Sequence, residues 1–158
     1  MLSDKNKKII HDFLNTSKEN IIKDHLSLNQ KASGKFIAGL AVVDNENGGQ
    51  LIDGAGYSYF LEYGRKPTGS GGGGGGMSLL DSIKIWFAAK GLTITKGFNP
   101  YSVTKSIHAK GTVQHRKGGN SGVITNTVND SVLNKFFEKF ATEYHTEAYS
   151  EVSKTLTI

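Results

Sequence analysis

The sequence predicts an α+β fold: a small antiparallel β-sheet packed with a long N-terminal helix, two short central helices and a long C-terminal helix. Three patterns support this prediction. Apolar residues recur at helical spacing at both ends of the chain, two short β-prone runs flank a turn-forming segment, and two central segments begin at a capping residue and end at a glycine. Because 158 residues is a usual length for one domain, we expect a single domain over residues 1–158.

The first element predicted is an amphipathic helix from Ser3 to about Leu26. Its apolar face contains Ile9, Ile10, Phe13, Leu14, Ile21, Ile22 and Leu26. Three polar residues, Asn15, Thr16 and Ser17, interrupt this face, and such residues compete for backbone hydrogen bonds. They predict a kink or a break into two helices.

A β-hairpin is predicted next. The β-prone runs KFIAGLAVVDN (35–45) and GQLIDGA (49–55) are separated by NENGG, which contains the turn-forming pair Asn-Gly. The following run, YSYFLEYG (57–64), places Tyr57, Tyr59, Leu61 and Tyr63 on one alternating set. The positions of Phe60 and Glu62 leave a short helical turn as an equal alternative.

The two central helices are predicted from their caps. Ser78, followed by Asp81, is an N-cap pattern before an apolar face with Ile83, Trp86 and Phe87, and Gly91 closes this helix. Asn99 and Pro100 open the second helix, and Gly111 supplies its left-handed stop.

The C-terminal helix is predicted over residues 130–153. Its apolar and aromatic side chains step by threes and fours: Leu133, Phe137, Phe140, Tyr144, Ala148 and Val152. We interpret this stripe as a surface for packing within the subunit or between subunits.

Composition limits the classes of partner. The net charge of +5 and the pI near 9.3 permit contact with nucleic acid or with acidic protein surfaces. The densest basic stretch, residues 105–119, supplies four candidate contacts with phosphate or with an acidic partner: Lys105, Lys110, Arg116 and Lys117. The chain has no cysteine, no signal-peptide core and no stretch long enough to span a bilayer, so we expect a soluble, unexported protein without membrane contact.

Motifs for catalysis are missing from the sequence. The run GSGGGGGG lacks the lysine and hydroxyl residue of a phosphate-binding loop, no HExxH or GxSxG occurs, and the histidines are scattered. We therefore expect no enzymatic activity, no metal site and no cofactor.

Glu62 is the charge that calls for an explanation. It lies between Leu61 and Tyr63 in a segment apolar enough to be half-buried, and a buried carboxylate needs a partner. Arg65, Lys66 or a lysine of a neighbouring subunit could supply it. The alternative is a solvent-facing glutamate on an edge strand.

Three segments in order, FLEYGRKPTG, SIKIWFAAKGL and YSVTKSIHAKGT, give the chain a family resemblance. Over about residues 57–112 it resembles the small tail-completion or neck proteins of tailed bacteriophages. Those proteins carry an aromatic-Leu/Val-Glu-aromatic-Gly corner, a basic-Pro-Gly loop, an Ile-x-x-Trp helix ending in Lys-Gly-Leu/Ile, and a helix ending in Gly-Thr. The chain departs from them after Pro67, where TGSGGGGGG replaces a proline-containing connection.

The resemblance implies a structural subunit of a virion, made in the bacterial host cytoplasm, that forms a ring at the head–tail interface. Its partners would be copies of itself, the portal or connector and tail proteins of the same particle, and DNA passing through the lumen. The candidates for subunit contacts are Tyr59, Phe60, Glu62, Tyr63, Arg65, Lys66, Trp86, Phe137 and Phe140. If residues 60–64 are anchored in the sheet, the glycine-rich loop at 66–77 is expected to be a flexible arm.

The alternative function is a small basic nucleic-acid-binding protein. The basic stretch at 105–117 and the high pI favour it, whereas no recognised reader motif is present.

Overall fold

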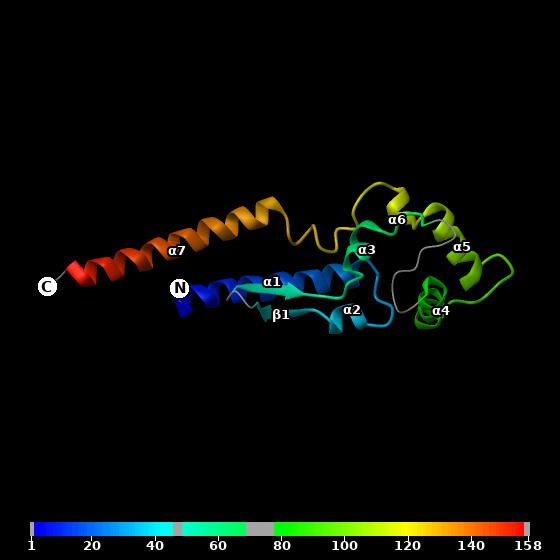
Figure 1. Cartoon of the computed structure of the whole chain (residues 1–158), viewed down its shortest axis with the longest axis horizontal. Helices are drawn as coiled ribbons and strands as arrows, with labels where there is room; N and C mark the ends of the chain where they lie inside the picture. The colour runs from blue at the N-terminus through cyan, green and yellow to red at the C-terminus, as the bar shows by residue number, and fades with distance from the viewer. Residues whose placement is uncertain (1, 46–48, 69–77, 157–158) are drawn as a thin grey trace.

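The computed structural model describes residues 2–45, 49–68 and 78–156, and these form the predicted α+β fold (Figure 1). In chain order the elements are α1 (Asp4–Ser27), α2 (Lys35–Ala38), β1 (Ala41–Asp44), β2 (Gln50–Asp53), α3 (Ser58–Tyr63), α4 (Leu79–Lys90), α5 (Pro100–Lys110), α6 (Val113–Arg116) and α7 (Asp130–Leu156). The predicted turn residues 46–48 and most of the predicted flexible loop, residues 69–77, lie outside the described residues.

Helix α1 begins where its capping residue predicts. The Ser3 hydroxyl accepts a hydrogen bond from the backbone N–H of Asn6 at 3.2 Å, which satisfies one of the free donors of the first turn. The helix then continues without a break through residues 15–17, so the predicted division into two helices is wrong. The Thr16 hydroxyl donates to the carbonyl of Asp12 at 2.9 Å, one turn earlier, and so does not compete with the helix.

The hairpin is shorter than predicted. Strands β1 and β2 pair antiparallel, with Val42 opposite Ile52, but the residues before β1 form helix α2. This corrects the prediction that strand structure starts at residue 35. The helical turn places Phe36 in the buried core. An extended chain would instead place successive side chains on two opposite faces.

The core lies where α1, α2 and the segment before α7 meet. Ile21, Phe36 and Val123 are its buried residues. Partly buried apolar side chains pack around them: Ile37, Leu40, Ile52, Leu61, Ile124 and Val128. The hairpin therefore covers one side of α1 near this small core (Figure 1).

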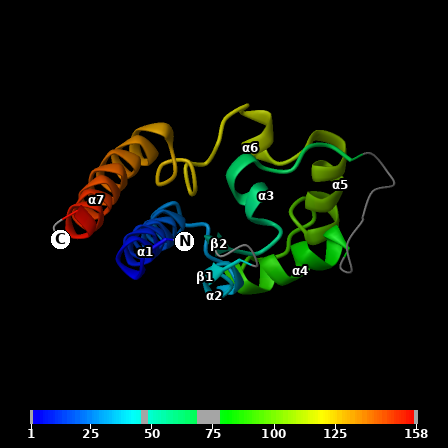
Figure 2. The same cartoon turned by 60° about the vertical axis from the view of Figure 1, so that its left-hand side comes forward.

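Helices α3 to α6 form a lobe at the end of the molecule away from the chain termini (Figure 2). We call residues 58–128 the lobe. Three of the predicted caps are confirmed: Ser78 accepts from the N–H of Asp81, Asn99 accepts from that of Ser102 in a capping box, and Gly91 takes a left-handed conformation. Gly111 ends α5 as predicted, but its φ of 74° and ψ of 177° are not the left-handed helical conformation that was expected. Helix α6 was not predicted, although Thr112 caps it by accepting from the N–H of His115.

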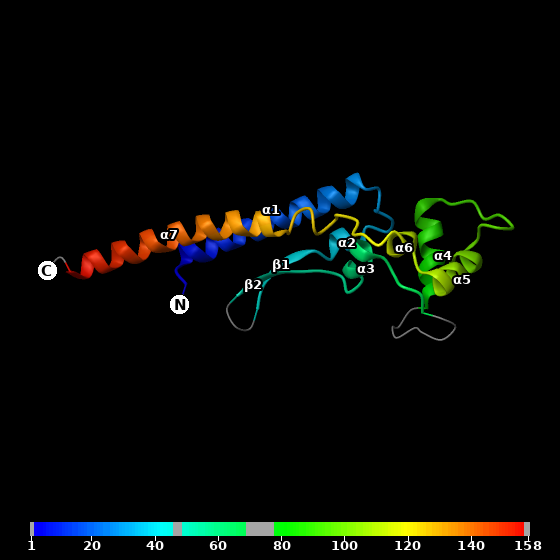
Figure 3. The ribbon, with the colours of Figure 1, turned by 90° about the horizontal axis from the view of Figure 1, so that it is seen from above.

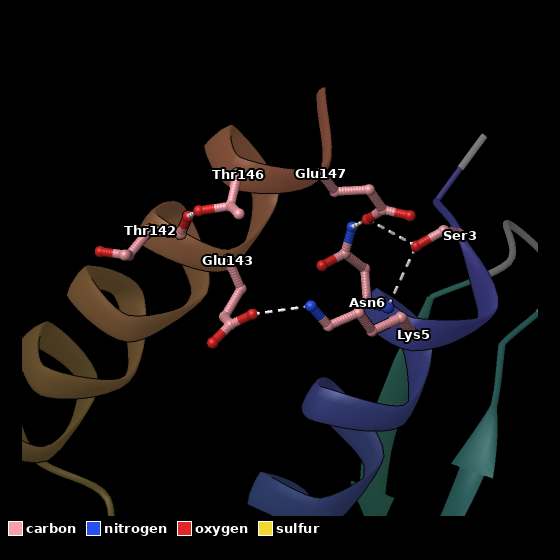
Figure 4. Close-up of polar contacts among 7 residues, drawn as sticks. All are labelled: Ser3, Lys5, Asn6, Thr142, Glu143, Thr146 and Glu147. Carbon is pink, nitrogen blue, oxygen red and sulfur yellow. Dashed lines mark hydrogen bonds and ion pairs between the residues drawn. The ribbon is translucent and has the colours of Figure 1, made fainter. Parts of the chain in front are cut away.

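Helix α7 runs antiparallel to α1 and extends past the start of α1 (Figure 3). Near that start, Lys5 forms an ion pair with Glu143 at 2.8 Å, and Ser3 and Asn6 donate to the Glu147 carboxylate (Figure 4). Deeper along the pair, the ring of Phe13 stacks on that of Phe136 with centroids 4.1 Å apart. Residues 148–156, which we call the overhang, lie beyond these contacts.

Candidate functional site

The corner predicted at residues 60–67 is built from helix α3 and the turn that follows it. Of the two alternatives for residues 57–64, the helical one is confirmed. The condition that residues 60–64 are anchored in the sheet is not met, because these residues join no strand. The helix divides its side chains between two sides. Glu62 is only 1% exposed, whereas Tyr59, Phe60 and Tyr63 are exposed and Tyr59 packs against both of the other rings.

The Glu62 carboxylate lies in a cradle formed by residues 121–125. One oxygen accepts from the backbone N–H of Gly122 at 3.2 Å and from the Thr125 hydroxyl at 2.6 Å. The other accepts from the N–H of Ile124 at 2.8 Å and from the Ser121 hydroxyl at 3.2 Å. The Glu62 carbonyl also accepts from the N–H of Ser121 at 2.7 Å, so the backbone is fixed together with the side chain.

The structure confirms that Glu62 is buried and corrects its expected partner. The residue is buried rather than solvent-facing, and within the described residues it forms no ion pair with Arg65 or Lys66. Neutral donors compensate its charge instead. Burial raises the pKa of Glu62, but the hydrogen bonds from Thr125, Ile124 and Gly122 outweigh it and hold the pKa below its ordinary value.

Two glycines allow the corner to approach α5 and α6 closely. Gly64 has φ 74°, and a Cβ there would collide with the Thr112 hydroxyl and the backbone nitrogen of His115. Gly111 also has φ 74°, and its Cβ would lie 2.7 Å from the carbonyl oxygen of Arg65. Only glycine tolerates such a backbone with atoms so near.

Hydrogen bonds close this junction. The backbone N–H of Arg65 donates to the Thr112 hydroxyl at 2.9 Å, and the N–H of Thr112 donates to the Arg65 carbonyl at 2.8 Å. Thr68 pairs with His108 through its hydroxyl at 2.7 Å and through its backbone N–H. The Glu-x-Gly motif at 62–64 and the Gly-Thr motif at 111–112 therefore meet in one place.

The four basic candidates all have exposed side chains and lie on α5, on α6 or directly after α6: Lys105, Lys110, Arg116 and Lys117. In the lobe as a whole, positive residues outnumber negative ones. The negative residues are Glu62 and Asp81, and the positive ones are Arg65, Lys66, Lys84, Lys90, Lys96, Lys105, Lys110, Arg116 and Lys117. Its net charge is therefore +7, and because the whole chain carries +5, the rest of the sequence carries −2.

Helix α4 presents Trp86 at its surface. The buried residue of this helix is Phe87, whose ring packs against Phe98 at a centroid distance of 4.9 Å, and Trp86 meets the edge of Phe87 from outside. Lys66, another candidate for subunit contacts, is also exposed, whereas Arg65 is half-buried.

On α7 the structure separates the two aromatic candidates. Phe140 is half-buried and stacks on Phe136, whereas Phe137 is 57% exposed. Phe136, which lies outside the predicted stripe, occupies the contact with α1 through Phe13. The predicted stripe therefore follows the edge of the helix pair and continues onto the overhang, where Val152 is exposed.

A shallow hollow of about 420 Å³ lies between α3 and the end of α6. Its lining is Tyr63, His115, Gly118, Gly119 and Asn120. Over the described ranges, no group of three or more histidine or acidic side chains is placed to hold a metal ion, and no helix has the length and apolar character needed to cross a membrane.

Neither known family models, nor curated proteins, nor solved structures include a match to this chain.

Proposed function

We propose that the protein is a nonenzymatic structural subunit of a tailed-phage particle, forming a ring at the head–tail interface as a tail-completion or connector protein. It acts by binding copies of itself and the adjacent connector and tail proteins. The assignment to a virion comes from the resemblance to tail-completion or neck proteins, which the corner, the tryptophan helix and the Gly-Thr helix carry. The exposed apolar surface supports the binding role.

The observation that carries the proposal is the large amount of apolar surface that the chain does not bury in itself. Within the described residues, four apolar side chains are buried, whereas nineteen large ones are exposed. The total accessible surface of the chain, polar and apolar together, is 10,848 Å², while a compact monomer of 17.1 kDa exposes about 7,800 Å² in total. A protein with this excess is suited to permanent contacts with other subunits.

The motifs of the resemblance lie where a rigid subunit needs them. Glu62, Gly64, Gly111 and Thr112 hold α3, α5 and α6 together through hydrogen bonds and close backbone contacts. This leaves Tyr59, Phe60 and Tyr63 on a fixed support and facing outward. Rigid aromatic side chains are typical anchors of protein–protein interfaces.

The test is the copy number of the protein in gradient-purified virus particles, measured by quantitative mass spectrometry against the major capsid protein. We expect a small, fixed number per particle that agrees with a closed ring. Absence from the particles would overturn the assignment to the virion.

The alternative of a small nucleic-acid-binding protein is favoured by one observation, the +7 charge of the lobe. It predicts steeply salt-dependent DNA binding by the isolated protein, which replacement of Arg116 and Lys117 would abolish. Salt-insensitive or undetectable DNA binding would contradict it.

A further inference from the structure

We infer that a cavity between α1 and the segment before α7 is a binding site for a neutral polyhydroxyl ligand, that is, a sugar. The inference goes beyond the proposed function and does not depend on it. It starts from Asn15, Thr16 and Ser17, the polar residues that interrupt the apolar face of α1 without breaking the helix. Thr16 and Ser17 line this cavity, whose volume of about 360 Å³ lies in the range of small-molecule sites.

One side of α1 forms the first wall of the cavity. Its residues follow one another at helical spacing and therefore share one side of the helix: Phe13, Thr16, Ser17, Asn20, Lys23 and Asp24. The second wall consists of Asn126 and Thr127, together with Val132 near the start of α7. The Thr127 hydroxyl donates to the Asp24 carboxylate at 3.4 Å, which joins the two walls.

Ser17 is the residue that points to a ligand. It is only 3% exposed, and the described residues form no hydrogen bond with its hydroxyl, although Ser17 lines the cavity. The neighbouring Thr16 differs, because its hydroxyl donates to the carbonyl of Asp12 at 2.9 Å. A buried hydroxyl without a partner costs free energy, so a polar group inside the cavity would stabilise Ser17.

Other polar groups around the cavity also have unused hydrogen-bonding capacity. The side-chain amides of Asn20 and Asn126 form no hydrogen bond with the described residues. The contact of Asp24 with Thr127 is longer than the usual O–H···O distance of about 2.5–3.0 Å, so this carboxylate can accept further donors. Both walls therefore offer donors and acceptors to the same ligand.

The charges and the donor pattern indicate the chemical class of the ligand. The charged residues among the described lining are Lys23 and Asp24, so an anion would meet the carboxylate and a cation would meet the ammonium group. Amide and hydroxyl side chains both donate and accept, and a ligand hydroxyl can match either role. A sugar carries several hydroxyls on one ring, and its C–H groups can contact the apolar part of the lining, Phe13 and Val132.

An NMR titration of the ¹⁵N-labelled full chain tests the inference. Glucose, galactose, mannose and N-acetylglucosamine are each added up to about 50 mM. We expect at least one of them to shift the amide signals of Ser17, Asn20, Asn126 and Thr127 in a saturable way, with a Kd of about 5 mM or tighter. The titration detects binding itself, whereas a thermal shift would also report the exclusion of sugar from the protein surface. Absence of saturable shifts at these residues with every sugar would overturn the inference.

Asn20→Ala and Asn134→Ala form a matched pair, because both asparagines are exposed on helices and Asn134 lies outside the cavity lining. We expect Asn20→Ala to weaken sugar binding at least about fivefold and Asn134→Ala to change it less than about twofold. Equal affinities of the two variants would contradict the site.

Ser17→Ala tests the residue that carries the inference. We expect sugar binding to weaken at least about fivefold, while the melting temperature without sugar stays the same or rises because an unpaired hydroxyl has been removed. A lower melting temperature with unchanged sugar binding would show that the hydroxyl serves the fold, and would overturn its assignment to a ligand.

Charged ligands test the chemical class. Inorganic phosphate and glycine are titrated in the same way, and tighter binding of either one at the same amides would overturn the choice of a neutral ligand. A free sugar and a sugar unit of a polysaccharide present the same hydroxyls, so the trisaccharide of the best monosaccharide separates these two sources. Tighter binding of the trisaccharide indicates a polysaccharide, and tighter binding of the monosaccharide indicates a free sugar.

Discussion

The corner and the overhang of α7 expose aromatic side chains in the same chain but are held in opposite ways. In the corner, Glu62 has four hydrogen-bond donors from residues 121–125, and Gly64 is in close contact with Thr112 and His115. In the overhang, residues 148–156 lie beyond the last contact between α7 and α1.

This difference separates two roles that apolar surface residues can have. The aromatic residues of the corner are fixed by polar contacts made about 50–60 residues further along the chain, so they form a ready-made surface. The apolar side of the overhang has the regular backbone of a helix, but its burial requires a partner outside the described chain. We therefore expect substitutions in the corner to unfold the protein and substitutions in the overhang to affect association alone.

The largest effect is expected for Glu62→Gln. The amide keeps one acceptor oxygen but turns its NH₂ group toward the backbone N–H of Gly122 or Ile124, and two donors cannot pair. We expect the free energy of unfolding to fall by about 3–4 kcal/mol. Urea denaturation followed by circular dichroism measures this loss.

Glu138→Gln is the matched control, because Glu138 is an exposed glutamate on α7. We expect its unfolding free energy to stay within about 0.5 kcal/mol of that of the unchanged protein. Equal stabilities of the two variants would show that the cradle does not hold the corner.

The next largest effect is expected for Gly64→Ala. The new Cβ would overlap the Thr112 hydroxyl and the nitrogen of His115, in addition to the cost of the positive φ. Gly91→Ala gives the cost at an ordinary left-handed position, since Gly91 has φ 61° and ψ 33° with nothing within 4 Å of its Cβ position, whereas Gly64, with φ 74° and ψ 175°, lies in a backbone region that essentially only glycine adopts. Thermal denaturation should give losses of about 3 kcal/mol for Gly64→Ala and about 1 kcal/mol for Gly91→Ala. Similar losses would rule out the close approach as the reason for glycine at 64.

Elements that depend on interactions between residues close in the sequence could be predicted, whereas elements that depend on distant contacts could not. Caps act over three or four residues, so Ser78, Asn99 and Gly91 located both central helices correctly. Helix α2 was not predicted, because its conformation depends on the packing of Phe36 in the core beside Ile21 of α1. The local β propensity of residues 35–45 carries no information about a contact with a residue so far away in the sequence.

The candidate site shows the same limit. The sequence indicates that Glu62 needs a partner, and we expected that partner to be a nearby positive charge. The cradle at 121–125 contains only hydroxyl and backbone donors and lies about 60 residues away, and no charge in the sequence marks it. On α7, Phe136 and Phe137 are neighbours of equal apolarity, so only the position of α1 decides which of them is covered.

A smaller effect is expected along α7, where Phe136→Ala and Phe137→Ala form a matched pair. Phe136 is half-buried and stacks on Phe13, so its truncation should lower the unfolding free energy by about 2 kcal/mol. Phe137 is mostly exposed, and its truncation should cost less than about 0.5 kcal/mol. Chemical denaturation of both variants measures the difference, and a larger loss for Phe137 would mean that the opposite side of α7 faces α1.

The smallest effect concerns pH, which acts on the core and the corner and not on the overhang. Burial lowers the pKa of His25, the Gln30 side chain opposes this, and the positive charges of Lys90 and Lys31 add to the lowering. The unfolded chain then binds a proton more readily than the folded one, so stability should be constant above about pH 6.5 and fall as the pH drops toward the folded pKa.

Glu62 also has a lowered pKa, so its contribution should be complete above about pH 4.5 and lost in stronger acid. Melting temperatures recorded from pH 8 to pH 3 should therefore fall in two steps, with His25→Gln removing the first and Val152→Ser altering neither. A profile that changes with Val152→Ser would mean that the overhang packs against its own chain, and the contrast between the two regions would fail.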